Sequence, residues 1–294
     1  MKPTFKKRSA LLVAAVSALA LVAAACVPPS SSDKWEFKAT NVTINDAQDE
    51  VRVFGACVAI PNCNDEPYVI NIATRVKIGK ANSASGFVVS SRDHNPENVP
   101  AGESRVLTGA AGAPVVYPGV QRLDIADLLN TNNKLEVMVV YTWVMEEDTV
   151  PVNTAANDVK DVLVDALNET LAKGSVPSDP NLLLDLILDN LGNMFTLLLS
   201  NIPLLGLGDD VGGGAINVGI AAKGGLANTI NATIGSADIP EFEIPVLDLP
   251  PSIKHVNIFT MGGTKTFTGQ AFNQYHVLGV NDATHTYDFQ ANQG

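Results

Sequence analysis

Short stretches in which apolar and polar residues alternate dominate the chain from Trp35 to about Val150. Successive side chains of a strand point to opposite faces, so such alternation predicts strands with one face on a core and the other in water. The clearest example spans residues 68–78. Its apolar face carries Tyr68, Ile70, Ile72, Thr74, Val76 and Ile78. Gly, Pro and Asn separate further predicted strands at 35–44, 51–60, 86–91, 104–107 and 135–145.

The apolar period changes to three and four residues after Pro151, which predicts a helix that begins at Asn153 or Thr154 and ends at Gly174. A second helix is predicted at 181–200, because Ser178-Asp179-Pro180 is a helix-start signal. Together the two segments predict a helical hairpin over 153–202. A brief helix is also expected at 123–130, without a clear cap.

The remainder returns to strand patterns after a glycine-rich apolar stretch at 204–236 and a proline-spaced piece at 240–251. Strands are predicted at 253–260, 264–268, 275–280 and 284–289, with Gly262-Gly263 as a hairpin turn.

The predicted fold is therefore mainly β with an α insertion. It is an antiparallel β-sandwich whose first part spans 35–150 and whose last strands lie in 239–294. Residues 151–238 are the insertion, which carries the helical hairpin and the glycine-rich apolar stretch. The alternative is two β domains flanking a helical one. The single sandwich is favoured because the last forty or so residues offer too few strands to fold alone.

The first 25 residues have the layout of a signal peptide. Four basic residues (Lys2, Lys6, Lys7 and Arg8) precede an apolar run over 10–25 that only Ser17 interrupts. The alternative is a permanent membrane anchor, but the run is shorter than the ~20 apolar residues that span a bilayer. The sequence therefore predicts an exported protein.

The segment Ala23-Ala24-Ala25-Cys26 resembles the cleavage box of bacterial lipoproteins, although Ala23 stands where that box usually has leucine. The resemblance implies a lipid on Cys26 and a cell-envelope location. Residues 26–34, which are rich in Pro and Ser, would then be a polar tether. Ordinary cleavage after Ala25, which would give a secreted protein, is the alternative. In an oxidising compartment Cys57 and Cys63 can form a disulfide, and a lipid on Cys26 leaves no odd thiol.

Net charge excludes one class of partner. The chain has 19 Lys and Arg against 31 Asp and Glu, and four of the basic residues lie in the signal. Without those four, 15 basic residues face the same 31 acidic ones. A field of that sign repels nucleic acid, so no nucleic-acid partner is expected, and it also repels anionic lipid surfaces. Beyond tethering through Cys26, the residues indicate no partner or ligand.

No catalytic motif is found. The histidines lack zinc-binding spacing, Ser83 replaces the first glycine of a nucleophile elbow, and the stretch 206–214 matches no phosphate loop. No catalytic residues and no cofactor are therefore predicted. A calcium site is a weaker hypothesis, because acidic loops at one rim of a sandwich can pool oxygen ligands. Its candidate residues are Asp46, Asp49, Asp65 and Glu66.

The polar residues of 181–200 form a narrow stripe that includes Asp185, Asp189, Asn193 and Thr196. Either the helix packs into the core with this stripe in water, or it enters a membrane with the stripe facing a pore or a partner. Eleven Leu, Ile and Phe between 182 and 199 favour insertion by about 5 to 6 kcal/mol, which two aspartates at about 2.5 to 3.5 kcal/mol each cancel. The core position is favoured.

These patterns predict an exported protein, in the cell envelope or secreted, with a binding or structural role rather than catalysis. One alternative is a membrane-inserting or pore-forming protein that uses the hairpin at 153–202. Another is an exported hydrolase whose serine, histidine and carboxylate meet only on folding.

Overall fold

A computed structural model describes the chain over residues 33–47, 52–53, 56–57, 64–147, 153–176, 182–183, 185–187, 189–190, 210–235, 253–275 and 281–293. The predicted signal peptide, Cys26 and most of the predicted tether lie outside these residues. Within them the fold is mainly β with an α insertion, as the sequence predicts.

Three long strands come from the first half of the chain and four from the second, joined by short strands and helices. The strands are β1 (Asp33–Asp46), β2 (Arg52–Val53), β3 (Ala56–Cys57), β4 (Asn64–Asp65), β5 (Pro67–Lys77), β6 (Ser85–Ser90), β7 (Val99–Pro100), β8 (Ser104–Val106), β9 (Val115–Val120), β10 (Glu136–Glu146), β11 (Asp210–Ile220), β12 (Ile253–Thr260), β13 (Thr264–Tyr275) and β14 (Asn281–Gln293). The helices are η1 (Arg92–His94), η2 (Gly109–Gly112), α2 (Ile125–Leu128), α3 (Asn153–Glu169) and α5 (Gly224–Ile234).

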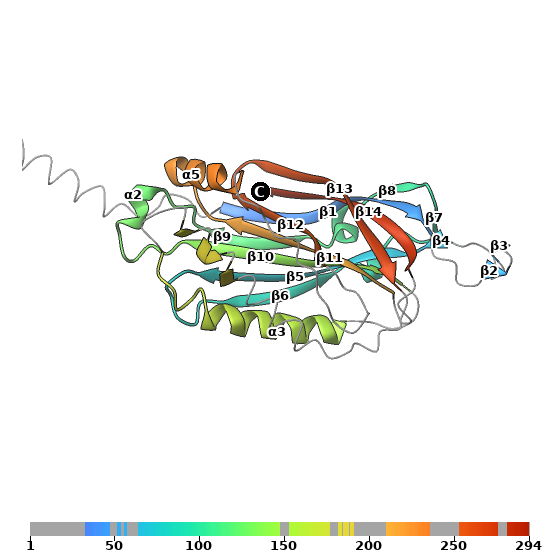
Figure 1. The fold of residues 1–294 in the computed structure, drawn as a ribbon, viewed down its shortest axis with the longest axis horizontal. Helices are drawn as coiled ribbons and strands as arrows, with labels where there is room; N and C mark the ends of the chain where they lie inside the picture. Colours follow the sequence, from blue (N-terminus) through green and yellow to red (C-terminus); the bar gives the residue numbers. More distant parts are fainter. Residues whose placement is uncertain are drawn as a thin grey trace, which may run out of the picture.

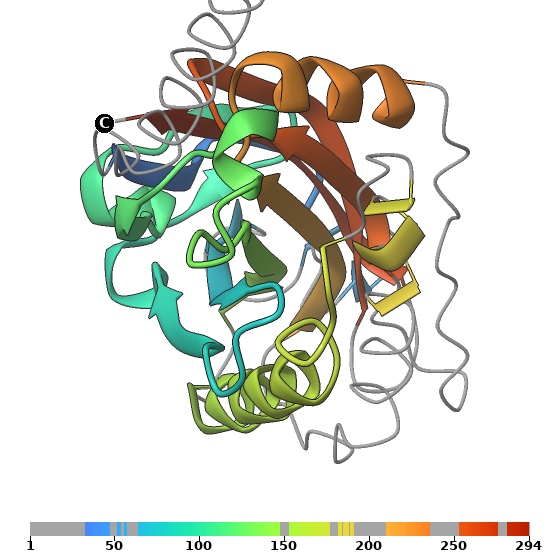
Figure 2. The same ribbon diagram turned by 90° about the vertical axis from the view of Figure 1, so that its left-hand side faces the viewer.

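One ten-stranded sheet runs in the order β6-β5-β10-β11-β13-β14-β1-β8, with β12 beside β11 and β9 beside β1. The ladders are antiparallel except that between β11 and β12. Seen end-on, the sheet curls, so that β1, β9 and β14 face β5 and β10 (Figure 2). The predicted sandwich thus consists of two halves of one continuous sheet.

Hydrogen bonds join the two halves across the inner space. The Tyr117 hydroxyl on β9 donates to the carbonyl oxygens of Thr74 on β5 (3.1 Å) and Val139 on β10 (3.3 Å). The Asn71 amide on β5 donates to the Ala113 carbonyl at 2.7 Å. Such side chains place a polar atom inside an apolar layer at low cost because each finds a partner. They fix how β9 lies over β5 and β10.

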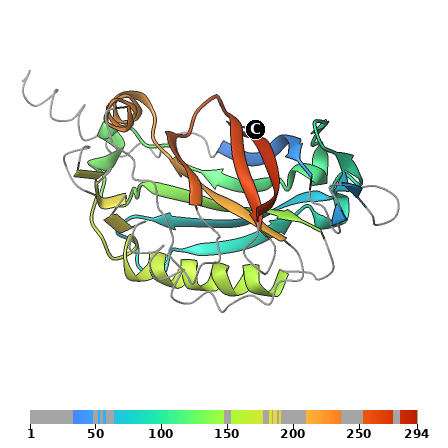
Figure 3. The same cartoon turned by 45° about the vertical axis from the view of Figure 1, so that its right-hand side comes forward.

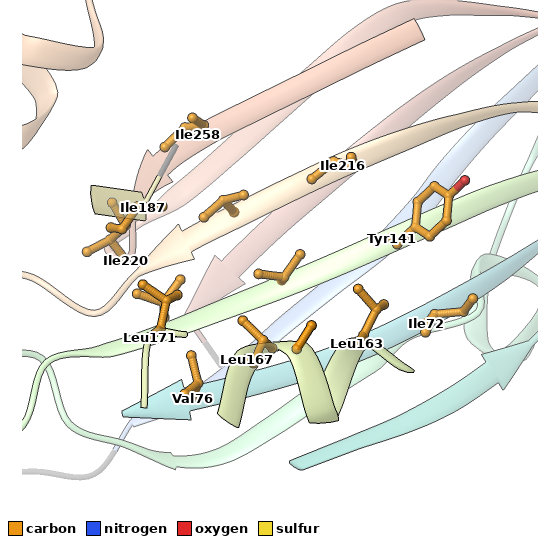
Figure 4. Close-up of a cluster of buried hydrophobic side chains, with 14 of the residues drawn as sticks. Ile72, Val76, Tyr141, Leu163, Leu167, Leu171, Ile187, Ile216, Ile220 and Ile258 are labelled. Carbon is orange, nitrogen blue, oxygen red and sulfur yellow. The ribbon is translucent and has the colours of Figure 1, made fainter. Parts of the chain in front are cut away.

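Two hydrophobic cores lie on opposite faces of the β5–β10–β11 half. The inner core, between the two halves, includes Phe37, Val115 and Phe289. The outer core lies beneath the helices, and α3 runs along this side of the sheet (Figure 3). In Figure 4, Leu163 and Leu167 of α3 point toward β5, where Ile72 and Val76 lie. The α3 helix therefore covers a sheet face that would otherwise be exposed.

The sequence analysis was wrong about the second face of β5. Residues 68–76 of this strand are buried apart from Arg75, which is half-buried, because the other half of the sheet covers the face that alternation assigned to water. Polar residues remain on that face because their groups are paired: Asn71 accepts from the Thr142 hydroxyl at 2.7 Å, and Arg75 forms an ion pair with Glu136.

The glycine-rich stretch also differs from expectation. Interpreted as an apolar turn outside the sandwich, it instead contains β11, which lies between β10 and β12 in the middle of the sheet, and then α5 (Figure 1). Gly214 shows why this strand contains glycine, since a Cβ there would lie 2.6 Å from the ring of Tyr141 on β10. Glycine on β11 leaves room for this large aromatic side chain on the neighbouring strand.

Most other predicted elements are present with shifted ends. The predicted strands at 264–268 and 284–289 are longer, in β13 and β14. Gly262-Gly263 does form a turn, but β12 pairs in parallel with β11, and the described ladders include none between β12 and β13. Of 51–60, the structure describes only the short β2–β3 pair.

Candidate functional site

A histidine and a carboxylate meet in the interior at one end of the molecule. His285 of β14 lies with Nε2 2.6 Å from Oδ2 of Asp65 in β4. Their side chains are 0% and 1% exposed. His285 is inward-facing because it shares the alternating buried face of β14 with Ala283, Tyr287 and Phe289. The pair therefore links β4 to β14 inside the fold.

Two more polar side chains complete this buried cluster. Tyr287, two residues along β14, is fully buried, and its hydroxyl has no hydrogen-bond partner among the described residues. Burial raises the pKa of Tyr287, and the nearby charges of Asp65 and Glu146 raise it further. Glu146, the last residue of β10, accepts the backbone N–H of Glu66 at 3.3 Å. We call Asp65, Glu146, His285 and Tyr287 the buried polar cluster.

A carboxylate that orients an imidazole is an arrangement used in general acid–base catalysis. A general base must also lie within hydrogen-bond reach of a substrate, and that requires access. All four members of the buried polar cluster are at most 4% exposed. The arrangement provides a buried side-chain hydrogen bond between β4 and β14.

The opposite end of the molecule holds a second polar arrangement, around Asp124. This residue caps α2, and its carboxylate accepts the backbone N–H groups of Ile125 (2.7 Å) and of Leu226 in α5 (3.2 Å). Asp127 accepts the backbone N–H of Asp124 in return, at 2.9 Å. The bond from Ile125 is the largest cause of a lowered Asp124 pKa, with smaller contributions from Leu226, Gly225 and Lys223. One carboxylate thus serves two helix starts.

Gly224 makes this contact feasible. Its φ is +56°, and a Cβ built there would lie 2.1 Å from Oδ2 of Asp124. The first turn of α5 is consequently filled by a carboxylate from the chain itself. The sequence analysis found no cap for the helix at 123–130, which was wrong, because Asp124 and Asp127 form a capping box.

The first residue of β1 lies at this same end. Asp33 pairs with Val120 in the sheet and forms a 2.8 Å ion pair with Arg122. We call this the tether end, because the predicted tether leads into Asp33. Figure 1 shows α2 and α5 together there, with the β2–β3 pair at the far end. Two apolar side chains of the α2 region are exposed at the tether end, Ile125 at 50% and Leu129 at 76%.

The predicted modification sites are only partly covered. Cys26 lies outside the described residues, so lipidation stays a prediction. Cys57 ends β3, whereas Cys63 is not among the described residues, so the disulfide stays a prediction as well.

Three of the four calcium candidates are described, and each has different surroundings. Asp65 is buried against His285, Glu66 accepts the N–H of Asn98 at 3.3 Å, and Asp46 is exposed at the end of β1; Asp49 is outside the described residues. In the part of the chain that the structure describes, no group of three His, Cys, Asp or Glu is placed to hold a metal ion.

The polar stripe is described only in its first half. Asp185 and Asp189 are exposed, while Leu183 and Ile187 are buried in the outer core. Asn193 and Thr196 lie outside the described residues. Within the described residues, no helix is long and apolar enough to cross a membrane.

By its architecture the protein is a mainly β protein in which one curled sheet forms both layers of a sandwich and helices cover one outer face. No protein-family model, no curated protein and no solved structure matches the chain.

Sequence reasoning missed both polar arrangements. The alternation of β14 would have placed His285 on the apolar face, but nothing in the sequence indicates Asp65 as its partner 220 residues away. Asp124-x-x-Asp127 is a local capping signal, whereas its second contact, to α5, depends on the fold.

Proposed function

We propose that this is an exported protein of the cell envelope, held to a membrane by lipid on Cys26, with a binding or structural role rather than a catalytic one. The observation that carries the second half of the proposal is the burial of the Asp65–His285 pair. Groups that could perform acid–base chemistry are used here to link β4, in the β4–β7 pair, to β14 of the large sheet.

The cluster has the energetics of an internal link. A buried hydrogen-bonded pair adds modest net stability, but removal of one partner from such a pair costs several kcal/mol. We therefore expect His285→Phe to lower the free energy of unfolding by about 3 to 5 kcal/mol. Urea denaturation measures this loss. His94→Phe, at an exposed position in η1, is the matched control and should change stability little.

The lipid half of the proposal has a direct test. Mass spectrometry of the mature N-terminus should find Cys26 as the first residue, carrying diacylglycerol, in the membrane fraction of the producing cell. An unmodified N-terminus in the medium would favour ordinary cleavage and a secreted protein. A Cys26→Ser variant should associate with the membrane much more weakly, while its circular dichroism stays unchanged.

The hydrolase alternative predicts turnover of ester, peptide or glycoside substrates by the purified protein. It would replace our proposal if such turnover were found and if His285→Phe abolished it without loss of folding.

The pore-forming alternative requires the hairpin at 153–202 to leave the sheet. Against it, Leu163 and Leu167 of α3 are buried in the outer core, as are Leu183 and Ile187. Freeing these side chains would expose a large apolar area. Leakage of dye from vesicles, lost on changing Ile187 to Asp, would support this alternative.

A further inference from the structure

The tether end combines exposed apolar side chains with the point where the chain would leave for its anchor. Leu129 is 76% exposed and Ile125 50% exposed, on and just after α2. Most large apolar side chains elsewhere in the described residues are covered, so two exposed ones at the two ends of the same short helix are a local feature.

The reach of the predicted tether limits where this end can be. Seven residue steps separate Cys26 from Asp33, and an extended chain spans at most about 3.6 Å per residue, or about 25 Å in all. Asp33 is fixed to the α2 region by its ion pair with Arg122. A lipid on Cys26 would therefore keep α2 close to the bilayer surface.

The opposite end lies much farther from the anchor. Strand β1 has 14 residues, and a strand of that length rises by about 45 Å. The strand leads from Asp33 to Asp46. Asp46 lies at the end of the molecule where β5 begins and β10 ends. That end lies beyond the reach of the tether unless the molecule lies flat.

The two ends of the molecule also differ in charge. Around the far end the described carboxylates outnumber the basic side chains, of which Arg92 and Arg105 are ion-paired with Glu147 and Glu103. The carboxylates there are Asp46, Asp65, Glu66, Asp93, Glu97, Glu103, Glu146 and Glu147.

The tether end is close to balanced. Its described acidic residues are Asp33, Glu36, Asp124, Asp127, Glu136, Glu169, Asp185 and Asp189, and its described basic residues are Lys34, Lys38, Arg75, Lys77, Lys80, Arg122, Lys134, Lys173, Lys223 and Lys265. An anionic membrane surface would repel the far end and tolerate the tether end.

We propose that the α2 tip of the tether end, with Ile125 and Leu129 at its centre, is a membrane-contact surface that rests on the bilayer carrying the lipid anchor. The inference rests on the proposed function in one respect, the lipid on Cys26. The contact holds the molecule upright, with its acidic end directed away from the membrane. Ile125 and Leu129 insert at the level of the headgroups, where exposed apolar side chains are stabilised.

The test holds the protein on vesicles without its natural lipid, so that it does not depend on Cys26. Residues 27–294, which retain every described residue, carry an N-terminal polyhistidine tag bound to nickel-chelating lipid in vesicles of phosphatidylglycerol and phosphatidylethanolamine. A nitrobenzoxadiazole probe is attached at Leu129→Cys or at Val106→Cys, with Cys57 and Cys63 changed to Ser. Val106 of β8 is the matched control, because it is also 76% exposed but lies away from the tether end.

We expect the probe at position 129 to shift its emission to the blue and to be quenched by brominated lipid, while the probe at 106 remains in water. Equal responses at the two positions, or an aqueous probe at 129, would overturn the membrane-contact surface. Mass spectrometry of Cys26 separately decides the proposed anchoring, so the two failures are distinguishable.

A second measurement avoids the probe. Co-sedimentation of the untagged chain with the same vesicles should show that Leu129→Gln weakens binding by about tenfold, as expected for one leucine no longer buried. Val106→Gln should leave binding unchanged. Equal binding by both variants would contradict the inference, provided that circular dichroism shows both to be folded.

Discussion

At the scale of single residues, the structure depends on a few side chains whose partners lie far away in the sequence. His285 and Asp65 are one case, and Asp124 with Gly224 is another. In each pair a carboxylate contacts a residue that a larger or apolar side chain could not replace without loss of the contact. Substitutions at these positions should therefore have larger effects than their chemistry alone would suggest.

Replacing Gly224 by Ala should lower the free energy of unfolding by about 2 to 3 kcal/mol. The left-handed backbone disfavours a Cβ, and the Cβ would also displace the carboxylate that caps α5. Gly263→Ala is the matched control, since its φ is +65° but nothing lies within 4 Å of the new Cβ. It should cost about 1 kcal/mol. Equal losses in urea denaturation would show that the Asp124 contact is unimportant.

Asp124 should also give stability a pH dependence. Its pKa is lowered in the folded protein, so its contribution is complete above the unfolded pKa of about 3.9 and is lost as the pH falls through the folded pKa. We expect the stability difference between wild type and Asp124→Asn to shrink as the pH is lowered from about 5 toward 2. Asp158→Asn, on the exposed face of α3, controls for removal of one negative charge. A difference that grows with acidity would contradict this account.

At the scale of elements, the sequence predicted those whose pattern is local. Alternation in β1 and β5 and the three-and-four period of α3 are set by neighbouring residues, and they placed these elements correctly. The sequence-based prediction failed for β11. Glycines such as Gly214 indicate a turn, and only the fold shows that Gly214 makes room for the Tyr141 ring. The prediction also missed that both faces of β5 are buried, since the curl of the sheet brings β9 over one of them.

The packing of β11 against β10 gives an element-scale prediction. Gly214→Ala should destabilise the protein by about 1 to 3 kcal/mol, because the new Cβ would lie 2.6 Å from the Tyr141 ring inside a packed layer. Gly219→Ala in the same strand is the control. Its Cβ would meet Met261 and Phe259 at 3.4 Å, which is ordinary contact, so little change is expected. Thermal unfolding of both variants tests this prediction. Equal decreases in the two midpoint temperatures would contradict it.

At the scale of the whole molecule, the separation of charge between the two ends is the least predictable property. The sequence shows an acidic chain, but the basic residues that follow the predicted signal peptide are spread along it from Lys34 to Lys265. Only the fold gathers many of them at the tether end, because several antiparallel strands and α3 begin or end there.

This distribution predicts how the protein approaches a charged surface. Lys80→Glu, an exposed change at the tether end, should slow association of the chain with phosphatidylglycerol vesicles by about twofold to fivefold at low ionic strength. The effect should fade as salt is added. Lys254→Glu changes an equally charged, exposed residue near the start of β12 and should slow association less. Stopped-flow light scattering measures the association rates. Equal rates for the two variants would contradict the charge separation.

The long pairing of β1 with β14 has a mechanical consequence. If the protein is anchored through its N-terminus and a partner pulls on the acidic end, the force runs along β1. The rungs from Trp35–Gln293 to Asp46–Thr284 would then be loaded together in shear, instead of opening one after another. Shear loading of this kind would give the β1–β14 pairing a high resistance to unfolding by force.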